Sequence, residues 1–217
     1  MSGYTIVNAL GCLLLLTSLW VVLTKSPKKS AFVYSVQSLV LVAIFISLGA
    51  TTGSTELFTW SGTAFLTKVI FVPAVVLFML KKMGEPDEDI EPVVKPVVSV
   101  MLAIVEFAIC FAVVQMIDLP AAAVVKPALA VSLAHFFIGL TCIVSQRNIV
   151  KQMFGYCLME NGSHLTLALL APQAPELVEI GIATDAIFAV LIMAVICYRV
   201  YKNVHTLNSD ELMELKG

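Results

Sequence analysis

Seven apolar segments follow one another along the chain and constrain its fold more than any other feature. A helix that crosses a membrane needs about 20 consecutive apolar residues. Segments of this kind lie at 4–24, 31–51, 58–80, 96–117, 122–145, 149–170 and 177–200. Hydrophobic residues make up 59% of the sequence and its mean hydropathy is +0.97, far above the values of soluble domains. The pattern predicts an all-α, polytopic membrane protein with seven transmembrane helices.

Composition also excludes several kinds of site. The net charge is −2, which gives no basic field for nucleic acid. The five cysteines lie singly in apolar runs, without CxxC spacing, and are expected to be buried thiols. There is no HExxH motif or glycine-rich phosphate loop. We therefore expect neither a metal nor a cofactor in this chain. The first apolar segment lacks a basic stretch before it and a cleavage pattern after it, so we expect it to remain as a helix.

Positive charges alternate from loop to loop. One set of loops carries Lys25, Lys28, Lys29, Lys81, Lys82, Lys95, Arg147, Lys151, Arg199, Lys202 and Lys216. The opposite set carries Glu56, Asp118, Glu176 and Glu179. Because basic loops stay in the cytoplasm, the pattern predicts a periplasmic N-terminus and a cytoplasmic C-terminus in a bacterial inner membrane.

Two parts of the chain show a weak internal similarity. Tyr34 and Phe154 align at an offset of 120 residues, and TKVIF aligns with TDAIF at an offset of 117. The alignment predicts a parallel repeat of helices 1–3 and 5–7, in which Lys68 and Asp185 are equivalent. Chance similarity in a sequence rich in Leu and Val is the alternative.

The repeat suggests a division into three parts. Residues 1–82 form an N-terminal three-helix unit, and residues 122–217 form a C-terminal three-helix unit. Residues 83–121 comprise an acidic cytoplasmic loop and a linking fourth helix.

Ionisable residues interrupt the apolar segments more often than packing requires. They are Lys68, Glu106, Lys126, His135, Glu160, His164 and Asp185. Such groups are costly in a membrane and usually face the bundle interior, where they form pairs and proton relays.

The stretch FGYCLMENGSHL contains the densest group. Glu160 and His164 are four residues apart and share a helix face with Tyr156. Glu160 lies nine residues beyond Lys151, about 13 Å into the membrane, where desolvation disfavours a charged carboxyl group. We expect Glu160 to take up and release protons. A static pair with a histidine or lysine that fixes the helix register is the alternative.

Asp185 and Lys68 provide further candidate groups. Asp185 lies 14 residues before Arg199, about 21 Å from the inner end, and is therefore expected to lie above Glu160. Lys68 precedes Pro73, which leaves the carbonyl group of Val69 without its helical donor. The alternative for Lys68 is a structural pair with Glu106 that holds the bundle together.

Two other ionisable residues leave more than one role open. Lys126 precedes Pro127 near the start of its helix, where a lysine commonly extends toward the membrane surface. His135 is interpreted either as a relay or as a hydrogen-bonded core histidine.

The stretch QRNIVKQMFGYCLMENGSHLTLALL and the tail LNSDELMELKG carry a resemblance to a known family. From about residue 128 onward, the chain resembles subunit K of respiratory complex I and the small proton-channel subunits of multisubunit cation/proton antiporters. The stretches KPALAV, CIVSQRN and PELVEIGIATDAIFAV extend the likeness. Over its whole length the chain is similar to the membrane component E of hydrogenase 4, a formate hydrogenlyase-type subunit.

This resemblance implies a subunit that is not an enzyme by itself. It implies a place among antiporter-like and other subunits of a membrane-bound [NiFe]-hydrogenase, with the NiFe centre and Fe–S clusters in partner chains. Two carboxylates of subunit K fall at Cys157, one turn before Glu160, and, after a one-turn gap, at Asp185. A scaffold that conducts no protons and an autonomous small-cation/proton transporter are the alternatives.

Overall fold

The computed structural model describes residues 3–86 and 90–212, with the backbone alone at 120–122. These residues are helical apart from loops and one isolated bridge between Asn148 and Asn208. The elements are α1 (Gly3–Leu23), α2 (Pro27–Thr52), α3 (Glu56–Ala64), η1 (Phe65–Phe71), α4 (Val72–Lys82), α5 (Pro96–Met116), η2 (Pro120–Val125), α6 (Lys126–Ser145), α7 (Ile149–Leu170), α8 (Glu176–Val204) and α9 (Ser209–Leu212). The all-α expectation is confirmed.

Six helical stretches in the described part of the chain are long and apolar enough to cross a membrane. They are Gly3–Leu23, Pro27–Thr52, Glu56–Lys82, Pro96–Met116, Ala123–Ser145 and Glu176–Val204. The third combines α3, η1 and α4. The 22-residue α7 has a similar length, but polar residues such as Lys151, Glu160, Asn161 and His164 lower its hydropathy. The seventh crossing therefore stays a prediction.

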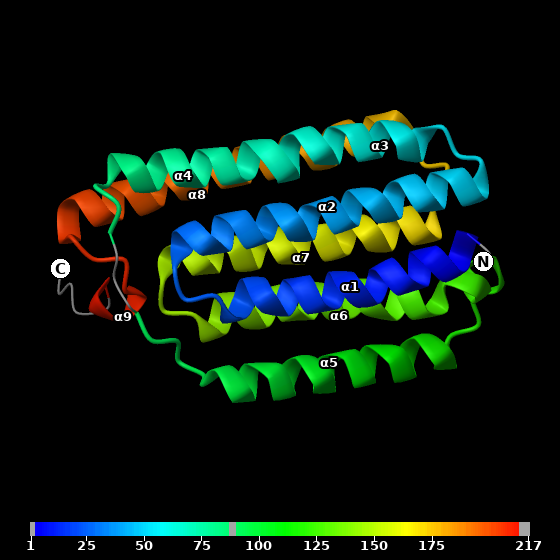
Figure 1. Ribbon diagram of the computed structural model, residues 1–217, viewed down its shortest axis with the longest axis horizontal. Helices are drawn as coiled ribbons and strands as arrows, with labels where there is room; N and C mark the ends of the chain where they lie inside the picture. Colours follow the sequence, from blue (N-terminus) through cyan, green and yellow to red (C-terminus); the bar gives the residue numbers. More distant parts are fainter. Residues whose placement is uncertain (1–2, 87–89, 213–217) are drawn as a thin grey trace.

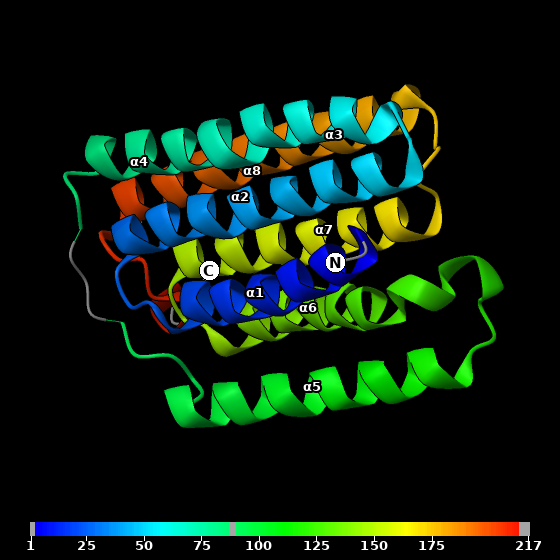
Figure 2. The same ribbon diagram turned by 45° about the vertical axis from the view of Figure 1, so that its right-hand side comes forward.

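The long helices lie side by side in one bundle (Figures 1 and 2). Helix α1 contacts α6, α2 contacts α7, and the continuous α3–α4 stretch contacts α8. The two members of each pair run in the same direction, and α5 lies at one edge beside α6 (Figure 1). Each helix of the first three thus has a partner among the last three.

The two ends of the bundle differ in charge. We call the end formed by the starts of α2, α5 and α7 the basic end, because the described lysines and arginines of the basic loops lie there. We call the opposite end the acidic end, since α3 and α8 begin there with Glu56 and Glu176. Lys216, the tail beyond Leu212 and residues 87–89 of the acidic loop lie outside the described residues.

Glycines bring α6 and α7 into close contact. A Cβ atom added at Gly155 would lie 2.9 Å from the carbonyl oxygen of Gly139, and one at Gly162 would lie 2.5 Å from the backbone nitrogen of Phe136. Side chains at either position would therefore push the helices apart. Small residues at these positions allow the close approach of the two helices.

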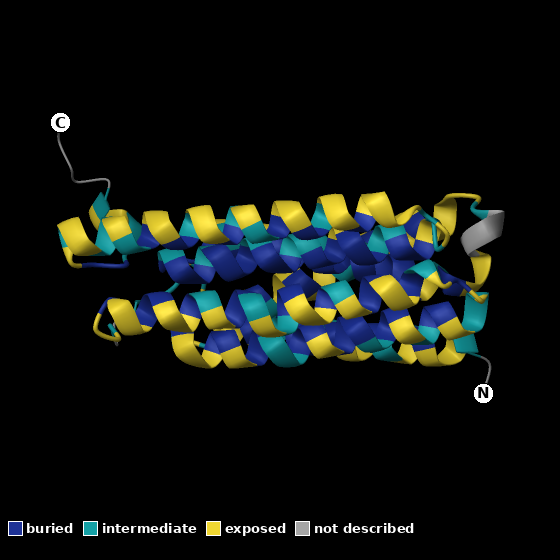
Figure 3. Ribbon diagram, turned by 90° about the horizontal axis from the view of Figure 1, so that it is seen from above, coloured by how far each residue is buried: buried dark blue, intermediate teal, exposed yellow. Residues whose placement is uncertain are grey.

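Buried residues lie between the helices and exposed residues lie on the outside (Figure 3). Many of the exposed residues are large and apolar. In the most apolar stretch of each helix, 61% of the residues are buried in α6 and 56% in α2, but only 22% in α5 and 28% in α8. Outward-facing apolar side chains suit a lipid environment. The arrangement agrees with a multi-pass membrane protein.

The described end of the chain is fastened to the turn between α6 and α7. The backbone N–H of Ile149 donates to the carbonyl of Leu207 over 3.0 Å, and the N–H of Ser209 donates to that of Arg147 over 2.8 Å. Arg147 also forms a 2.7 Å ion pair with Asp210. The two motifs that carry the family resemblance therefore meet in space.

Candidate functional site

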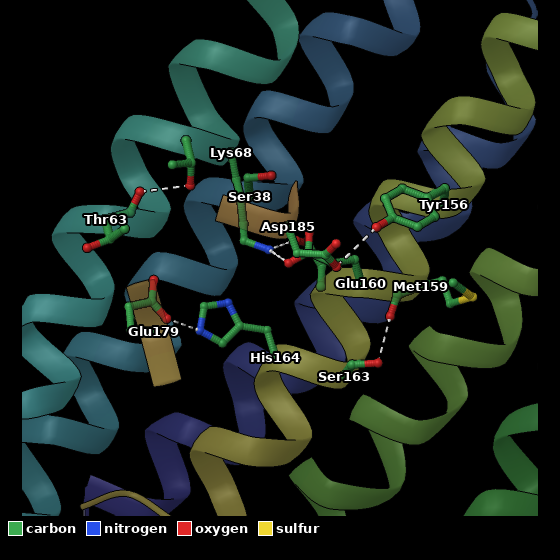
Figure 4. A network of polar contacts seen from close by, with 12 residues as sticks. Ser38, Thr63, Lys68, Tyr156, Met159, Glu160, Ser163, His164, Glu179 and Asp185 are labelled. Carbon is green, nitrogen blue, oxygen red and sulfur yellow. Dashed lines mark hydrogen bonds and ion pairs between the residues drawn. The ribbon is translucent and has the colours of Figure 1, made fainter. Parts of the chain in front are cut away.

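A buried ion pair joins η1 to α7 in the middle of the bundle. The Lys68 Nζ atom lies 2.5 Å from Glu160 Oε1 and donates to Asn161 Oδ1 over 2.7 Å (Figure 4). The side chain of Lys68 is only 1% exposed and that of Glu160 only 12%. Desolvating two charges is costly, so such a pair persists only where its geometry and added hydrogen bonds offset that cost. The amide of Asn161 supplies one such bond.

The helix that carries Lys68 is irregular where this lysine enters the network. Residues Phe65–Phe71 form a π-helix, and the N–H of Val72 donates to the carbonyl of Thr67, five residues back. Pro73 has no N–H for the carbonyl of Val69, which instead accepts a 3.2 Å hydrogen bond from Ser35 Oγ. The predicted polar break beside Lys68 is therefore present, and π-bulges are frequent at functional sites.

Hydrogen bonds extend this network laterally toward α1. The Asn161 Nδ2 group donates to Gln37 Oε1 over 3.0 Å, and Gln37 Nε2 lies 3.3 Å from His135 Nε2. His135 Nδ1 lies 2.5 Å from Ser18 Oγ. These four side chains are fully buried. The network thus runs from η1 through α7, α2 and α6 to α1, across the bundle rather than along it.

A second buried pair lies nearer the acidic end. His164 Nε2 is 2.7 Å from Glu179 Oε2, and the imidazole lies against the rings of Phe45 and Trp60, with centroids 4.7 and 5.4 Å away (Figure 4). The pair is close but is not aligned as a hydrogen bond. Within the described residues, His164 Nδ1 and Trp60 Nε1 have no hydrogen-bond partner. Glu160 and His164 therefore lie on the same helix face but have different partners: Glu160 pairs with Lys68, and His164 lies against Glu179.

Asp185 is an exposed residue of α8, which packs beside α7. Its exposed carboxylate accepts a 3.5 Å hydrogen bond from Tyr156 (Figure 4). Glu160 is ten residues from the acidic end of α7 and Asp185 is nine residues from that of α8, about 15 and 14 Å respectively. The two carboxylates thus lie at nearly the same depth, not at the different depths expected. The expectation failed because α8 extends farther than α7 at the basic end.

Glu106 and Lys126 lie outside the central network. Glu106 accepts a hydrogen bond from Thr141 on α6, so the alternative that it pairs with Lys68 is wrong. Helix α5 contacts α6 and α1 but is not adjacent to η1. Lys126 Nζ donates to the carbonyl of Ile117 over 2.9 Å near the acidic end, as expected of a lysine that extends to the surface.

Sequence reasoning missed several members of the site. Asn161 stood beside Glu160 in the densest polar stretch but was given no role, and Gln37 and Ser18 looked like ordinary polar residues of apolar helices. The charge pattern places Glu179, like Glu176, among the acidic loop residues. Residues three apart share a helix face, so the spacing of Glu176 and Glu179 gave no signal that Glu179 alone is buried.

Lys151 was also assigned to a loop, but only 2% of it is exposed. Its Nζ donates to the carbonyls of Val21 and Thr24, over 2.5 and 2.7 Å, and to Ser30 Oγ over 2.9 Å. The cation therefore sits at the carboxyl end of α1, where the helix dipole favours a positive charge. Lys151 joins α1, α2 and α7 at the basic end.

No group of three or more His, Cys, Asp and Glu side chains in the described part of the chain could hold a metal ion. The centre of the bundle and its surroundings contain a lysine, two histidines and three carboxylates. They are Lys68, His135, His164, Glu160, Glu179 and Asp185.

Comparison with known proteins agrees with this membrane setting. The chain is 49% identical to hydrogenase-4 component E of Escherichia coli strain K12 over 217 residues, which cover all of both proteins. It belongs to the hydrogenase-4 component E family. The same protein of Escherichia coli O157:H7 and that of Shigella flexneri are also 49% identical over the full length of both chains.

A second comparison concerns the C-terminal part of this family member. Residues 127–217 match the family of NADH-ubiquinone/plastoquinone oxidoreductase chain 4L, which corresponds to complex I subunit K. Both predicted resemblances are confirmed, including the expected start near residue 128. No solved structure matches the chain. Family membership supports a membrane component that is not an enzyme by itself, because the relatives are named as one component of a hydrogenase.

Proposed function

We propose that this chain is a non-catalytic membrane subunit of a [NiFe]-hydrogenase complex of the hydrogenase 4, or formate hydrogenlyase, type. It contributes to a transmembrane proton path that is coupled to electron transfer. The observation that carries this proposal is the buried Lys68–Glu160 pair, which continues through hydrogen bonds to His135. The NiFe centre and Fe–S clusters belong to partner chains, and antiporter-like subunits are the expected membrane neighbours.

The membrane placement forms part of the proposal. Helix α7 crosses the membrane as a seventh helix, because its polar side chains are held by α2, η1 and α8 and need no water. The basic end faces the cytoplasm of a bacterial inner membrane, and the acidic end faces the periplasm. The chain then begins in the periplasm and ends in the cytoplasm.

We also propose that helices α1–α4 and α6–α8 are a parallel repeat. The paired helices run in the same direction, and α5 packs beside α6 at the edge without a partner of its own among the described helices. The rings of Tyr34 and Phe154, which align at an offset of 120 residues, meet with centroids 5.7 Å apart. Lys68 and Asp185 then occupy equivalent helices on either side of Glu160. This supports units at 1–82 and 122–217 with 83–121 between them.

Each titratable side chain has a proposed task. Glu160 takes up a proton from the basic end, and Lys68 stabilises its charged form. His135 and His164 relay protons, and Asp185 with Tyr156 passes them to a neighbouring subunit. Glu106 adjusts the local potential from α5, as Lys126 does more weakly from the surface. The side chains that sequence reasoning missed, Asn161 and Gln37, supply the hydrogen bonds between these groups.

Two other functions lead to different results. A scaffold that only holds antiporter-like subunits in place requires intact helix contacts but no titratable groups. An autonomous cation/proton transporter works after reconstitution alone, whereas a complex subunit does not. The many outward apolar side chains of the described residues are compatible with a subunit surrounded by lipid and other subunits.

The decisive experiment measures proton movement by membrane vesicles that carry the whole complex during formate-driven hydrogen evolution. Neutralising one partner alone would leave a buried charge unpaired and destabilise the fold. The test variant is therefore the double substitution Lys68→Gln with Glu160→Gln, which removes both charges. The matched control is Lys28→Gln with Glu85→Gln, which removes a surface ion pair of the same chain.

Assembly is measured in the same vesicles. We expect the complex to assemble with both double variants and proton movement to disappear only when Lys68 and Glu160 are neutral. Unchanged proton movement in the assembled test variant would show that the pair is structural and favour the scaffold. Proton movement by the reconstituted chain alone would favour the autonomous transporter.

A further inference from the structure

Asp185 stands on the outside of the bundle, on a helix that the rest of the chain covers poorly. Only 28% of the most apolar stretch of α8 is buried. The hydrogen bond from Tyr156 is the contact that the described residues give to the exposed Asp185 carboxylate, and no described cation forms an ion pair with it. Lys68 is already engaged by Glu160 and Asn161. A carboxylate at this depth is costly against lipid and faces protein or water.

The side of α8 that bears Asp185 has the form of a helix-packing surface. Gly181, Asp185, Ile192 and Ile196 recur at helical spacings and lie on one stripe. A Cβ atom added at Gly181 meets nothing within 4 Å, so a neighbouring backbone has room to approach closely. A groove of about 360 Å³ between α6, α7 and α8, lined by Tyr156 and Ile196 among others, continues beside this stripe toward the basic end.

Helix α5 shows that exposure alone does not produce such a surface. It is as poorly covered as α8, with 22% of its most apolar stretch buried. Its ionisable residue, Glu106, turns toward Thr141 on α6, and its outward side chains include the apolar Met101, Ile104 and Ile109. Apolar side chains of this kind need only lipid around them. The stripe on α8 differs because a carboxylate stands in its middle.

We propose that the α8 stripe is the docking surface for a transmembrane helix of a partner subunit, which places a lysine or arginine side chain against Asp185. Charge complementarity identifies the occupant, since a cation at the same depth would remove the cost of an unpaired carboxylate. Tyr156 orients the carboxylate from the other side. The inference requires that α8 crosses the membrane, but not that protons pass through Asp185.

Cross-linking in the purified, intact complex tests the docking surface. A photo-reactive phenylalanine analogue replaces Ile192 on α8 or, as a matched control, Ile109 on α5. The two isoleucines are 57% and 58% exposed. We expect Ile192 to yield an adduct with a transmembrane helix of another subunit that contains a lysine or arginine at the depth of Asp185. Ile109 should yield mainly lipid.

Several outcomes would overturn the proposal. They are an adduct of Ile192 with lipid or quinone alone, a cross-linked helix without a basic residue, a cross-link to a second copy of this chain, and an equal protein yield from Ile109. The last would mean that exposure alone accounts for the cross-link.

A charge exchange tests the chemistry at the same surface. Asp185→Lys should reduce the recovered complex by more than about tenfold, because two cations would meet in the membrane. Changing the mapped lysine or arginine of the partner to aspartate should restore assembly. Assembly unaffected by Asp185→Lys, or not restored by the exchange, would refute the pairing. Neither readout depends on proton movement, so failure here is distinguishable from failure of the proposed function.

Discussion

Helices α7 and α5 have almost the same length, 22 and 21 residues, but opposite characters. Helix α7 contains buried Lys151, Asn161 and His164 and contacts α2, α6 and α8. Helix α5 is the most apolar of the candidate spans and packs mainly against α6. In a membrane, lipid accepts apolar side chains but offers no hydrogen bonds. The most polar helix is therefore the one enclosed by protein, and the most apolar one lies at the edge.

The largest expected difference concerns the carboxylates of these two regions, Glu160 on α7 and Glu106 on α5. Lys68→Leu leaves the Glu160 carboxylate buried without its cation and should cost about 3–5 kcal/mol of unfolding free energy. Thr141→Val, which removes the hydrogen bond to Glu106 on α5, should cost about 1 kcal/mol. Unfolding by sodium dodecyl sulfate in mixed micelles measures both losses. Equal losses would show that burial does not distinguish the two carboxylates.

The contact between α6 and α7 should be nearly as sensitive. Gly155→Leu inserts a side chain where even a Cβ atom would lie 2.9 Å from the Gly139 carbonyl oxygen. Such overpacking should cost about 1–3 kcal/mol or more. Gly62→Leu on α3 is the control, because a Cβ atom there meets nothing within 4 Å. The same unfolding measurement applies, and a tolerated Gly155→Leu would contradict the close packing.

The pair near the acidic end is expected to show a smaller, specific coupling. A double-mutant cycle of His164→Phe and Glu179→Gln should give an interaction free energy of about 0.5–3 kcal/mol, since their polar atoms are 2.7 Å apart. A cycle of Glu179→Gln with Ser163→Ala is the control, because Ser163 is exposed and bonds to its own helix. Additive effects in the first cycle would show that His164 and Glu179 do not interact, and that the pair is not part of the site.

The smallest effect should appear at the starts of the two helices. Asn148 accepts hydrogen bonds from the N–H groups of Val150 and Lys151, so Asn148→Ala should cost about 1 kcal/mol. Lys95, at the start of α5, makes no side-chain capping bond, and Lys95→Ala should change stability very little. Thermal unfolding of the detergent-solubilised protein compares them. A larger loss from Lys95→Ala would contradict the assignment of the cap.

The candidate site was only partly predictable from sequence. The i, i+4 spacing of Glu160 and His164 placed them on one helix face, and Pro73 revealed the irregular backbone beside Lys68. Neither feature identified the partners of these residues. Glu160 pairs with Lys68, 92 positions away, and His164 lies 2.7 Å from Glu179 on the next helix. The expected alternative partner, Glu106, lies across the bundle, because α5 packs on the far side of α6.

The order of apolar segments and the charges between them determined by themselves that this chain is an all-helical membrane protein. These properties follow from local rules, since every residue of a spanning helix must satisfy its own backbone and tolerate lipid. Only the tertiary structure decided that Lys68, Asn161, Gln37 and His135 form one network and that Asp185 faces outward. Those relations depend on how the helices rotate and slide against one another, which glycines and buried pairs on different helices determine together.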